Sequence, residues 1–238
     1  PAGVTFSLGS SSPPPPADQF EQYQEGTGVW AESVLKDLTL EEKVSQLFFP
    51  YAYGVYRSED DPEYKRLIDL VERFKVGGVV FFQGDPFSQA LLANDLQHHA
   101  AIPLIAAQDM ESGAGMRLTR TTTFPSAMAM GATRDTDLAY AAGLSTAREA
   151  RALGIHQVLA PVADINNNAR NPVINVRSFG ERPQLVADMV SAFTYGLQDG
   201  NVLATAKHFP GHGDTATDSH SDLPVLPFDR ARLDSVEL

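Results

Sequence analysis

The 238-residue sequence contains no cysteine, which excludes disulfide bonds and thiolate chemistry. It also has no apolar run of the roughly 18 residues that a membrane-spanning helix needs. Basic residues are few: 18 lysines and arginines against 30 aspartates and glutamates give a net charge of -12. Such a surface repels nucleic acid and anionic lipid, so neither is an expected partner. The absence of a GxGxxG or Walker phosphate loop argues against a nucleotide-binding sheet.

Residues 1–29 differ in composition from the rest of the chain. They are rich in serine, glycine and proline, with four consecutive prolines from Pro13 to Pro16, and this favours an extended, solvated tail or linker. No basic region followed by an apolar core marks an intact signal peptide. The segment is either a disordered tail or cloning remnant, or the stalk left after removal of an export signal or lipid anchor. The second interpretation favours a periplasmic, lipid-anchored or secreted protein over a cytoplasmic one.

From residue 30 onward, helical and strand patterns alternate, and we assign residues 30–238 to one domain. A helix is expected after Thr39, a fair N-cap followed by Glu41 and Glu42. Strands are predicted at residues 77–82, 102–109, 155–166 and 201–209. Further helices are predicted at residues 85–101, 135–154 and 182–200. This order predicts a parallel sheet with helices outside it.

Polar residues cluster where the predicted strands end. Asp109 and Glu111 follow one strand, Asp164 lies at the end of the next, and Lys207 and His208 end the last. In a (β/α)₈ barrel these carboxyl-terminal strand ends form the active-site face, and an open doubly wound sheet obeys a similar rule. The sequence therefore predicts a functional site at this edge of the sheet.

The segment KHFPGHGDTATDSHSDLP, residues 207–224, holds His208, His212 and His220 among three aspartates. A metal site is one interpretation, but Pro210 and Gly211 disrupt the helix that would bring His208 and His212 onto one face. A solvated loop without chemistry is another. Acid–base chemistry is the third. In an extended segment, Asp218 and His220 point to the same side, so the carboxylate can orient the imidazole. A histidine held in this way can protonate a leaving group and later activate water.

The same segment resembles the signature of glycoside hydrolase family 3, in its bacterial β-N-acetylglucosaminidase branch: KHFPGHG, four variable residues, then DSH. The resemblance extends back through IPLIAAQDMESGAGMRL, TTFPSAMAMGAT and GIHQVLAPVADINNNARNPVINVRSFGERP, and covers about residues 38–227. It implies a TIM-like (β/α)₈ barrel. It also implies a retaining exo-β-N-acetylglucosaminidase that acts on GlcNAc-terminated glycans, peptidoglycan-derived muropeptides first, without a metal or organic cofactor.

The resemblance also implies roles for particular residues. His220 would be the general acid/base, oriented by Asp218. The sugar subsite would consist of Asp109, Arg117, Arg177, Lys207 and His208. Arg177 could instead be a structural ion-pair partner, and Asp164 could merely brace the barrel mouth. The remaining histidines, His98, His99, His156 and His212, have expected structural roles.

Two departures from the family pattern bear on these expectations. SGAGMR follows Glu111 where a glycine pair is usual, so the shape of that loop is in question. Retention also needs a carboxylate nucleophile, which in relatives follows a later strand. We therefore expect the barrel to be incomplete at its C-terminus and the nucleophilic Asp to lie after Leu238. A β-glucosidase or phosphorylase of the same family, or a non-catalytic carbohydrate-binding module, are the alternatives.

Overall fold

A computed structural model of the chain describes residues 28–237. The chain divides into two compact units, residues 1–44 and residues 45–238, and each is considered by itself. The predicted tail, residues 1–29, lies almost entirely outside the described residues, so its boundary at residue 30 stays a prediction. Of the described helices, none is both long and apolar enough to cross a membrane.

The described part of the first unit is helical. Residues 28–37 form a helix, and α2 (Leu40–Ser45) follows. Thr39 caps α2 as predicted, because its Oγ1 accepts a hydrogen bond from the N–H of Glu42 at 3.2 Å. The Glu42 carboxylate accepts in return from the N–H of Thr39 at 2.8 Å. This reciprocal pair is a capping box, which satisfies two backbone donors at the start of the helix.

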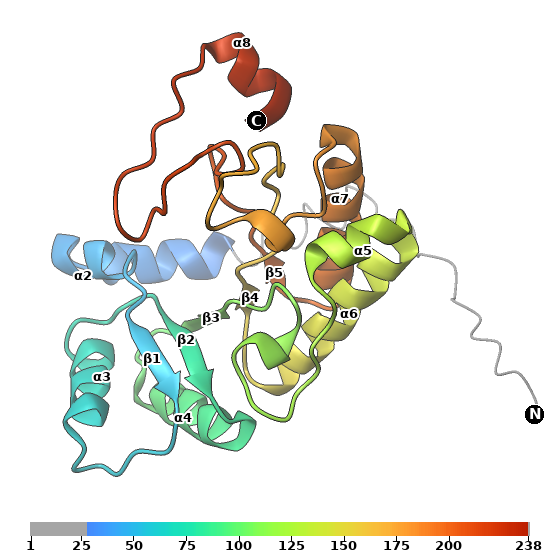
Figure 1. The fold of residues 1–238 in the computed structure, drawn as a ribbon. Coiled ribbons are helices and arrows are strands. Elements are labelled where there is room, and N and C mark those ends of the chain that lie inside the picture. The colour runs from blue at the N-terminus through green and yellow to red at the C-terminus, as the bar shows by residue number, and fades with distance from the viewer. Residues whose placement is uncertain (1–27, 238) are drawn as a thin grey trace, which may run out of the picture. The chain divides into compact units, whose positions relative to one another are not determined.

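The second unit is built on one sheet of five parallel strands in sequential order (Figure 1). They are β1 (Tyr51–Gly54), β2 (Gly78–Gly84), β3 (Ile105–Gln108), β4 (Gln157–Val158) and β5 (Leu203–Ala204). A doubly wound sheet reverses its order at a switch point, whereas a barrel keeps the order of the chain. The fold is therefore of the TIM-like α/β class, as the sequence predicts. The described residues hold five of the eight strands of a complete barrel.

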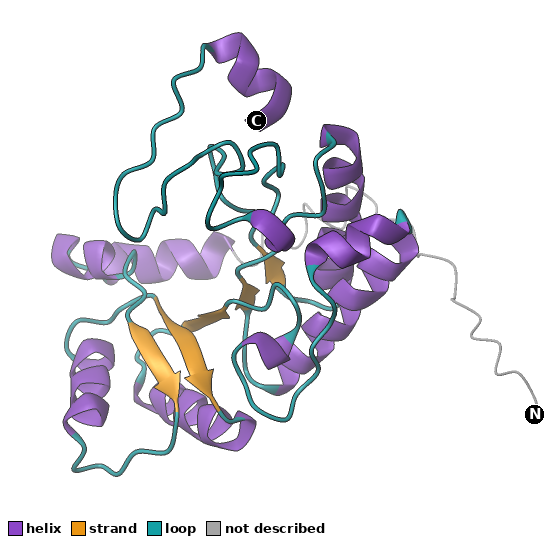
Figure 2. Cartoon of the chain, in the orientation of Figure 1, coloured by secondary structure: helices purple, strands orange, loops and turns teal. Residues whose placement is uncertain are grey.

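Helices alternate with these strands (Figure 2). They are α3 (Pro62–Glu72), α4 (Pro86–His99), α5 (Ala127–Thr133), α6 (Thr136–Ala152), α7 (Pro183–Asp199) and α8 (Arg230–Arg232), with short 3₁₀ turns η1 (Ala114–Met116) and η2 (Asn175–Arg177) and a π turn η3 (Leu233–Glu237). Asp61, Asp85 and Asp135 cap α3, α4 and α6 with side-chain oxygens. Proline opens α3, α4 and α7, where its missing N–H costs nothing.

The core lies between the sheet and the helices. Ala52, Phe81 and Val158 are fully or almost fully buried and belong to the same cluster as Leu67 of α3 and Phe193 of α7. Burial alternates along β1, where Tyr51, one residue before Ala52, is 51% exposed. This alternation follows from the period of two along a strand. β3 is instead buried at successive residues, Ala106, Ala107 and Gln108, so both faces of the sheet are covered there.

α6 and α7 form the most extensive helix pair of the second unit, and small residues let them approach closely. A Cβ added at Gly196 of α7 would lie 2.2 Å from the carbonyl oxygen of Tyr140 on α6, and one at Gly143 would lie 2.3 Å from that of Phe193. No side chain fits at these distances, so only glycine permits this packing of backbone on backbone.

The predicted helices at residues 85–101, 135–154 and 182–200 are confirmed as α4, α6 and α7. The predicted strands are also found, but the last two pair over only two residues each, at β4 and β5. The predicted helix after Thr39 ends at Ser45. The sequence analysis did not identify β1, α3, α5 or α8.

Candidate active site

A pocket of about 560 Å³ lies where the strands end, and its polar lining comes from segments far apart in the sequence. Asp109 directly follows β3, and Lys207 pairs with Val162 through a parallel bridge beyond β4 and β5. The lining residues are Asp109, Glu111, Met116, Arg117, Leu159, Val173, Arg177, Thr205, Lys207, His208, His212, Ser219 and His220. The carboxyl ends of the parallel strands therefore form the pocket, as expected for this fold class.

Asp109 stands between two cations. Its Oδ1 accepts a hydrogen bond from Nζ of Lys207 at 2.7 Å, and its Oδ2 accepts one from Nη2 of Arg117. Burial alone would raise the pKa of Asp109, but the hydrogen bonds and charges of Lys207 and Arg117 outweigh it and hold the pKa below its ordinary value. The Arg117 guanidinium lies 5.0 Å above the ring of Phe82. Asp109 is thus ionised and fixed in place.

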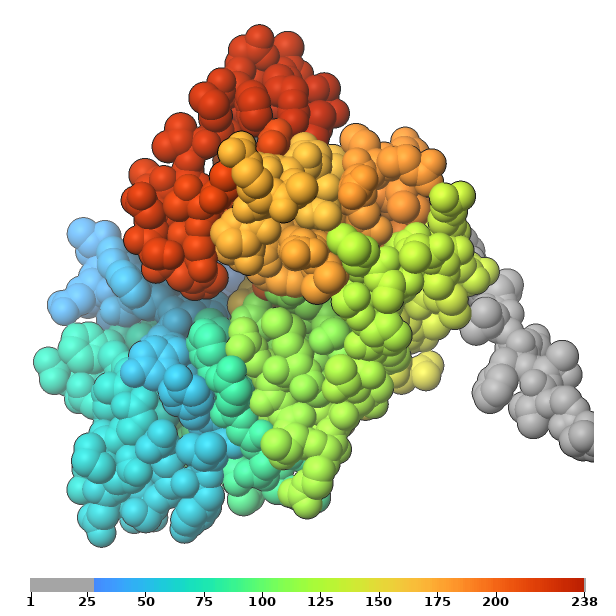
Figure 3. Space-filling view, in the orientation of Figure 1, coloured from blue at the N-terminus to red at the C-terminus, as the bar shows by residue number. Residues whose placement is uncertain are grey.

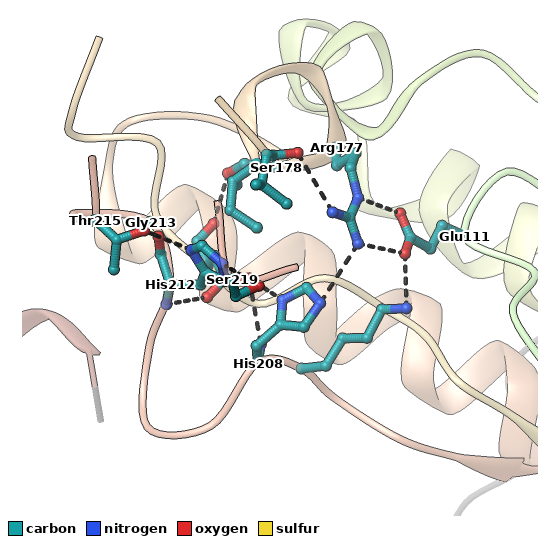
Figure 4. Close-up of polar contacts among 12 residues, drawn as sticks. Glu111, Arg177, Ser178, His208, His212, Gly213, Thr215 and Ser219 are labelled. Carbon is teal, nitrogen blue, oxygen red and sulfur yellow. Dashed lines mark hydrogen bonds and ion pairs between the residues drawn. The ribbon is translucent and has the colours of Figure 1, made fainter. Parts of the chain in front are cut away.

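Glu111 forms a second ionic centre beside the first (Figure 4). Nε and Nη2 of Arg177 donate to its two oxygens at 2.9 and 2.8 Å, a bidentate pair, and Nζ of Lys207 lies 2.7 Å from Oε1. Burial would raise the pKa of Glu111, but Arg177 and Lys207 reverse this and lower it. The bond to Glu111 in turn raises the pKa of Arg177. Arg177 thus forms an ion pair within the pocket itself.

Asp164 is buried and holds two histidines of the pocket lining. Its Oδ2 lies 2.6 Å from Nδ1 of His208 and accepts the backbone N–H of the same residue at 3.2 Å. Its Oδ1 accepts the backbone N–H of His212 at 2.6 Å. The other nitrogen of His208, Nε2, lies 3.4 Å from Nη2 of Arg177, which can only donate. A ring with its proton on Nδ1 satisfies both contacts.

His212 is buried and uses both ring nitrogens. Nδ1 lies 2.6 Å from Oγ1 of Thr215, and Nε2 lies 3.0 Å from Oγ of Ser219. The side chain of Asn171 donates to the backbone carbonyl of His212 at 2.7 Å. His212 therefore orders the loop around it, the role expected from the sequence.

The histidine-rich loop packs directly on the segment that follows β4. A Cβ added at Gly213 would lie 1.9 Å from the carbonyl oxygen of Ile165, so no larger residue fits there. Asn168 also donates to the carbonyl of Asp214 at 3.0 Å. In Figure 3 the red residues from about 205 onward lie against the yellow and orange residues of this segment. Residues 213 and 214 of the loop are therefore held against the segment that follows β4.

Asp218 and His220 form the predicted pair. Oδ1 of Asp218 lies 2.7 Å from Nδ1 of His220 and also accepts the backbone N–H of His220 at 2.9 Å. Two hydrogen bonds from His220 lower the pKa of Asp218. The larger effect comes from the backbone N–H of His220 and the next from its side chain. The reason given for the pairing was wrong, however. The two residues lie in a turn rather than in an extended segment, and the Asp218 carboxylate bonds to His220, two residues further along that turn.

The structure brings the predicted sugar-subsite residues together in one pocket, and His220 lines the same pocket while Asp218 supports it from outside the lining. The predicted set omitted Glu111, Asp164 and Ser219. Glu111 carried a signal, since it follows a strand two residues after Asp109. Asp164 also carried a signal, as a polar residue at the end of a predicted strand. Its contacts and that of Ser219 cross loops without a regular pattern, so no local signal indicated their partners.

The other histidines lie elsewhere. His98 and His99 end α4, and Nδ1 of His99 lies 2.6 Å from Glu72. Nδ1 of His156 accepts the backbone N–H of Ala106 at 3.0 Å. These contacts agree with the structural roles expected for them. In residues 28–237, no group of three or more acidic or histidine side chains is arranged to hold a metal ion.

A larger pocket, of about 730 Å³, lies between the loop after β1 and helices α3 and α4. Its one arginine, Arg57, is paired with Asp61 at 3.1 Å, and Tyr64 donates to Asp95 at 2.7 Å. It lacks the joined carboxylates and cations of the strand-end pocket. The chemistry therefore points to the smaller pocket.

The profile of the glycosyl hydrolase family 3 N-terminal domain matches residues 39–238. The chain belongs to glycosyl hydrolase family 3. It is 37% identical over 186 residues to a protein named beta-hexosaminidase A of Pseudoalteromonas piscicida, a match that covers 72% of this chain and 31% of the relative. It is also 37% identical over 191 residues to a beta-N-acetylglucosaminidase/beta-glucosidase of Cellulomonas fimi, covering 80% of this chain and 33% of the relative.

A solved structure of a family 3 beta-N-acetylglucosaminidase from Paenibacillus sp. str. FPU-7 superposes with a TM-score of 0.75 at 41% identity. That match covers 84% of this chain and 38% of the Paenibacillus chain. This family 3 domain therefore has the TIM-like fold of its relatives. It spans about a third of the length of the two curated relatives.

Proposed function

We propose that the full-length protein is a retaining exo-β-N-acetylglucosaminidase that releases terminal GlcNAc from glycans, with peptidoglycan-derived muropeptides as the first substrates to consider. The relatives named above support the activity class. The observation that carries the proposal is that His220, paired with Asp218 at 2.7 Å, lines the same pocket as the ionic network around Asp109 and Glu111.

The proposed acid–base chemistry follows from the pairing. Because Asp218 accepts from Nδ1 of His220, the other ring nitrogen, Nε2, is left to exchange a proton with the substrate. In the first step Nε2–H protonates the glycosidic oxygen as the bond to the leaving group breaks. In the second step Nε2 takes a proton from the incoming water. Asp218 stays ionised throughout and stabilises the imidazolium.

The proposed sugar subsite consists of Asp109, Arg117, Arg177, Lys207 and His208. Sugar hydroxyls bind well to charged and bidentate partners, and this set offers both carboxylate acceptors and cationic donors. The ion pairs of Asp109 with Arg117 and Lys207, and that of Arg177 with Glu111, hold these groups in position before substrate arrives. Preorganisation of this kind lowers the entropic cost of binding.

A retaining reaction also needs a carboxylate nucleophile at the anomeric carbon. Neither acidic residue of the pocket suits that role, because each is bonded to two cations: Asp109 to Arg117 and Lys207, and Glu111 to Arg177 and Lys207. A carboxylate held in this way is a poor nucleophile. We therefore propose that the nucleophile is a carboxylate other than those of Asp109 and Glu111.

The test compares 4-nitrophenyl N-acetyl-β-glucosaminide with 4-nitrophenyl β-glucoside in the full-length protein, with His220→Ala alongside. We expect preference for the first substrate and a loss of about 10²-fold or more in the variant, the usual contribution of a general acid/base. Preference for the glucoside would indicate a β-glucosidase, and binding of GlcNAc without turnover would indicate a binding module. A variant as fast as the parent would contradict the assigned role of His220.

Inorganic phosphate separates hydrolysis from phosphorolysis. Histidine as acid/base places no second carboxylate near the acceptor, so an anionic acceptor is chemically compatible with this site. Product analysis in the presence of phosphate distinguishes GlcNAc from GlcNAc 1-phosphate. We propose hydrolysis, and formation of the sugar phosphate as the main product would contradict it.

A further inference from the structure

The loop that carries the acid/base is exposed, and within residues 28–237 one side-chain hydrogen bond joins it to the interior. The His220 side chain is 82% exposed and that of Asp218 is 43% exposed. Within residues 216–222 the hydrogen bonds of Asp218, His220, Ser221 and Asp222 stay inside the loop. Among the described residues, the bond from Ser219 to His212 is the exception. Without it, this turn would have no hydrogen bond to the body of the domain.

The partner of Ser219 is buried and makes several contacts. His212 is 7% exposed, and its ring lies edge-on to that of His208 with centroids 5.8 Å apart. The hydroxyl of Thr215 donates to the backbone carbonyl of His212 at 2.9 Å, so it accepts from Nδ1–H of the same ring. That leaves Nε2 of a neutral ring as an acceptor for the hydroxyl of Ser219. A serine hydroxyl can also accept, so the contact survives protonation of the ring.

His212 is also linked to the sugar subsite. Asp164 accepts the backbone N–H of His212 through one oxygen and bonds to His208 through the other. A short chain of contacts therefore runs from His208 through Asp164 and His212 to Ser219. Figure 4 labels both histidines and Ser219. Each link is 3.0 Å or shorter. The buried carboxylate of Asp164 thus holds both His208 of the subsite and His212, to which the acid/base loop is bonded.

We propose that Ser219 is a positioning residue, whose bond to His212 fixes the Asp218–His220 pair over the pocket. This inference rests on the proposed glycosidase function. Ser219 lies between the paired residues in the sequence, so fixing its side chain fixes the turn from which both project. Because proton transfer requires the acid within hydrogen-bond reach of the leaving oxygen, a mobile turn would weaken acid catalysis in particular.

The test uses Ser219→Ala and Ser219→Thr in the full-length protein, with Ser221→Ala as the matched control. Ser221 is two residues away, and among the described residues its hydroxyl bonds only to the backbone carbonyl of Asp218, within the same loop. The substrates are the phenyl and 3,4-dinitrophenyl N-acetyl-β-glucosaminides, and the quantity measured is kcat/KM. Phenolate needs protonation as it leaves, whereas the dinitrophenolate hardly does.

We expect Ser219→Ala to lose about 10- to 100-fold on the phenyl substrate, less than the roughly 10²-fold or more that a complete loss of general acid catalysis would cost, and only a few-fold on the dinitrophenyl substrate. Ser219→Thr, which keeps the hydroxyl, should recover most of the loss, and Ser221→Ala should behave as the parent. Equal losses on both substrates would indicate a general structural defect and overturn the proposal. So would an unchanged rate on the phenyl substrate.

Hydrogen exchange separates this inference from the proposed function. Amides of residues 216–222 should exchange faster in Ser219→Ala than in the parent and in Ser221→Ala, whether or not either protein turns over GlcNAc substrates. If exchange in Ser219→Ala is unchanged from the parent, the proposal that the Ser219–His212 bond holds the loop is overturned. An inactive parent with the expected exchange pattern would instead contradict the glycosidase function, and the Ser219–His212 bond would remain a structural feature of the loop.

Discussion

The carboxylate of Asp164 lies 2.6 Å from Nδ1 of His208 and, through its other oxygen, 2.6 Å from the backbone nitrogen of His212. The two histidines are on opposite sides of the turn at Pro210 and Gly211. One buried side chain therefore determines the shape of this turn and the orientation of an imidazole in the pocket. Burying a carboxylate is costly unless it is fully hydrogen-bonded, and here both oxygens are occupied.

Replacement of Asp164 by Asn should weaken both stability and sugar binding. The Asn amide has one acceptor oxygen, so its NH₂ group must face either the N–H donors of His208 or that of His212. We expect a loss of about 1–3 kcal/mol in the free energy of unfolding, the usual cost of an unsatisfied buried group. Urea denaturation measures it. A variant as stable as the parent would show that the buried bonds of Asp164 contribute little.

Much of the fold could be predicted from local signals. α4 and α6 begin at Asp85 and Asp135, which the structure shows as caps, and α7 begins at a proline. α3 carries the same signals, Asp61 followed by a proline, and was nonetheless missed. The strands that correspond to β3, β4 and β5 were predicted too long, because apolar character does not measure pairing. After Val158, for example, Pro161 cannot donate to a ladder.

The residues of the candidate active site could be predicted from the sequence better than the contacts between them. Family motifs located Asp109, Lys207 and His220, and the strand-end rule located their neighbourhood. The motifs gave no indication of how Asp164 and Ser219 act. Asp164 acts through residues 44 to 48 positions away, and Ser219 reaches His212 across an irregular loop. Such contacts depend on tertiary packing, which sequence periodicity does not describe.

Arg177→Lys should impair substrate binding although the charge is kept. The guanidinium donates to both oxygens of Glu111 and also faces His208, and an ammonium group cannot reproduce this fork. We expect KM for the GlcNAc substrate to rise about tenfold or more, with a smaller change in kcat, since one good charged hydrogen bond corresponds to about 1.5–3 kcal/mol.

Arg73→Lys is the matched control for this change. Arg73 also faces a carboxylate, that of Asp69 at 3.6 Å, but its side chain is 70% exposed and far from the strand-end pocket. Exposed pairs of this kind contribute little to stability. The control should keep the KM of the parent. If both variants raise KM equally, the geometry of the Arg177–Glu111 pair is not what matters for binding.

Acid should remove the contribution of Asp109 to stability. Its pKa in the folded protein lies below the ordinary value of 3.8, so the carboxylate stabilises the fold above about pH 4, and this contribution is lost as the pH falls through the folded-state pKa. Asp109→Asn should therefore be less stable than the parent at pH 7, and the difference should shrink below pH 4. Unfolding titrations between pH 7 and pH 2.5 measure it. A difference that stays constant or widens in acid would contradict the assignment.

Gly196→Ala should destabilise the domain although alanine is the better helix former. In an exposed helix the change would gain about 1 kcal/mol, but here the new methyl group would lie 2.2 Å from the carbonyl oxygen of Tyr140. The two helices must separate to admit it, and overpacking of this kind costs about 1–3 kcal/mol. Ser191→Ala, at an exposed position of α7, is the control and should leave stability nearly unchanged. Thermal unfolding of both variants tests the contact. A stabilised Gly196→Ala variant would mean that α6 and α7 do not approach each other as closely as described.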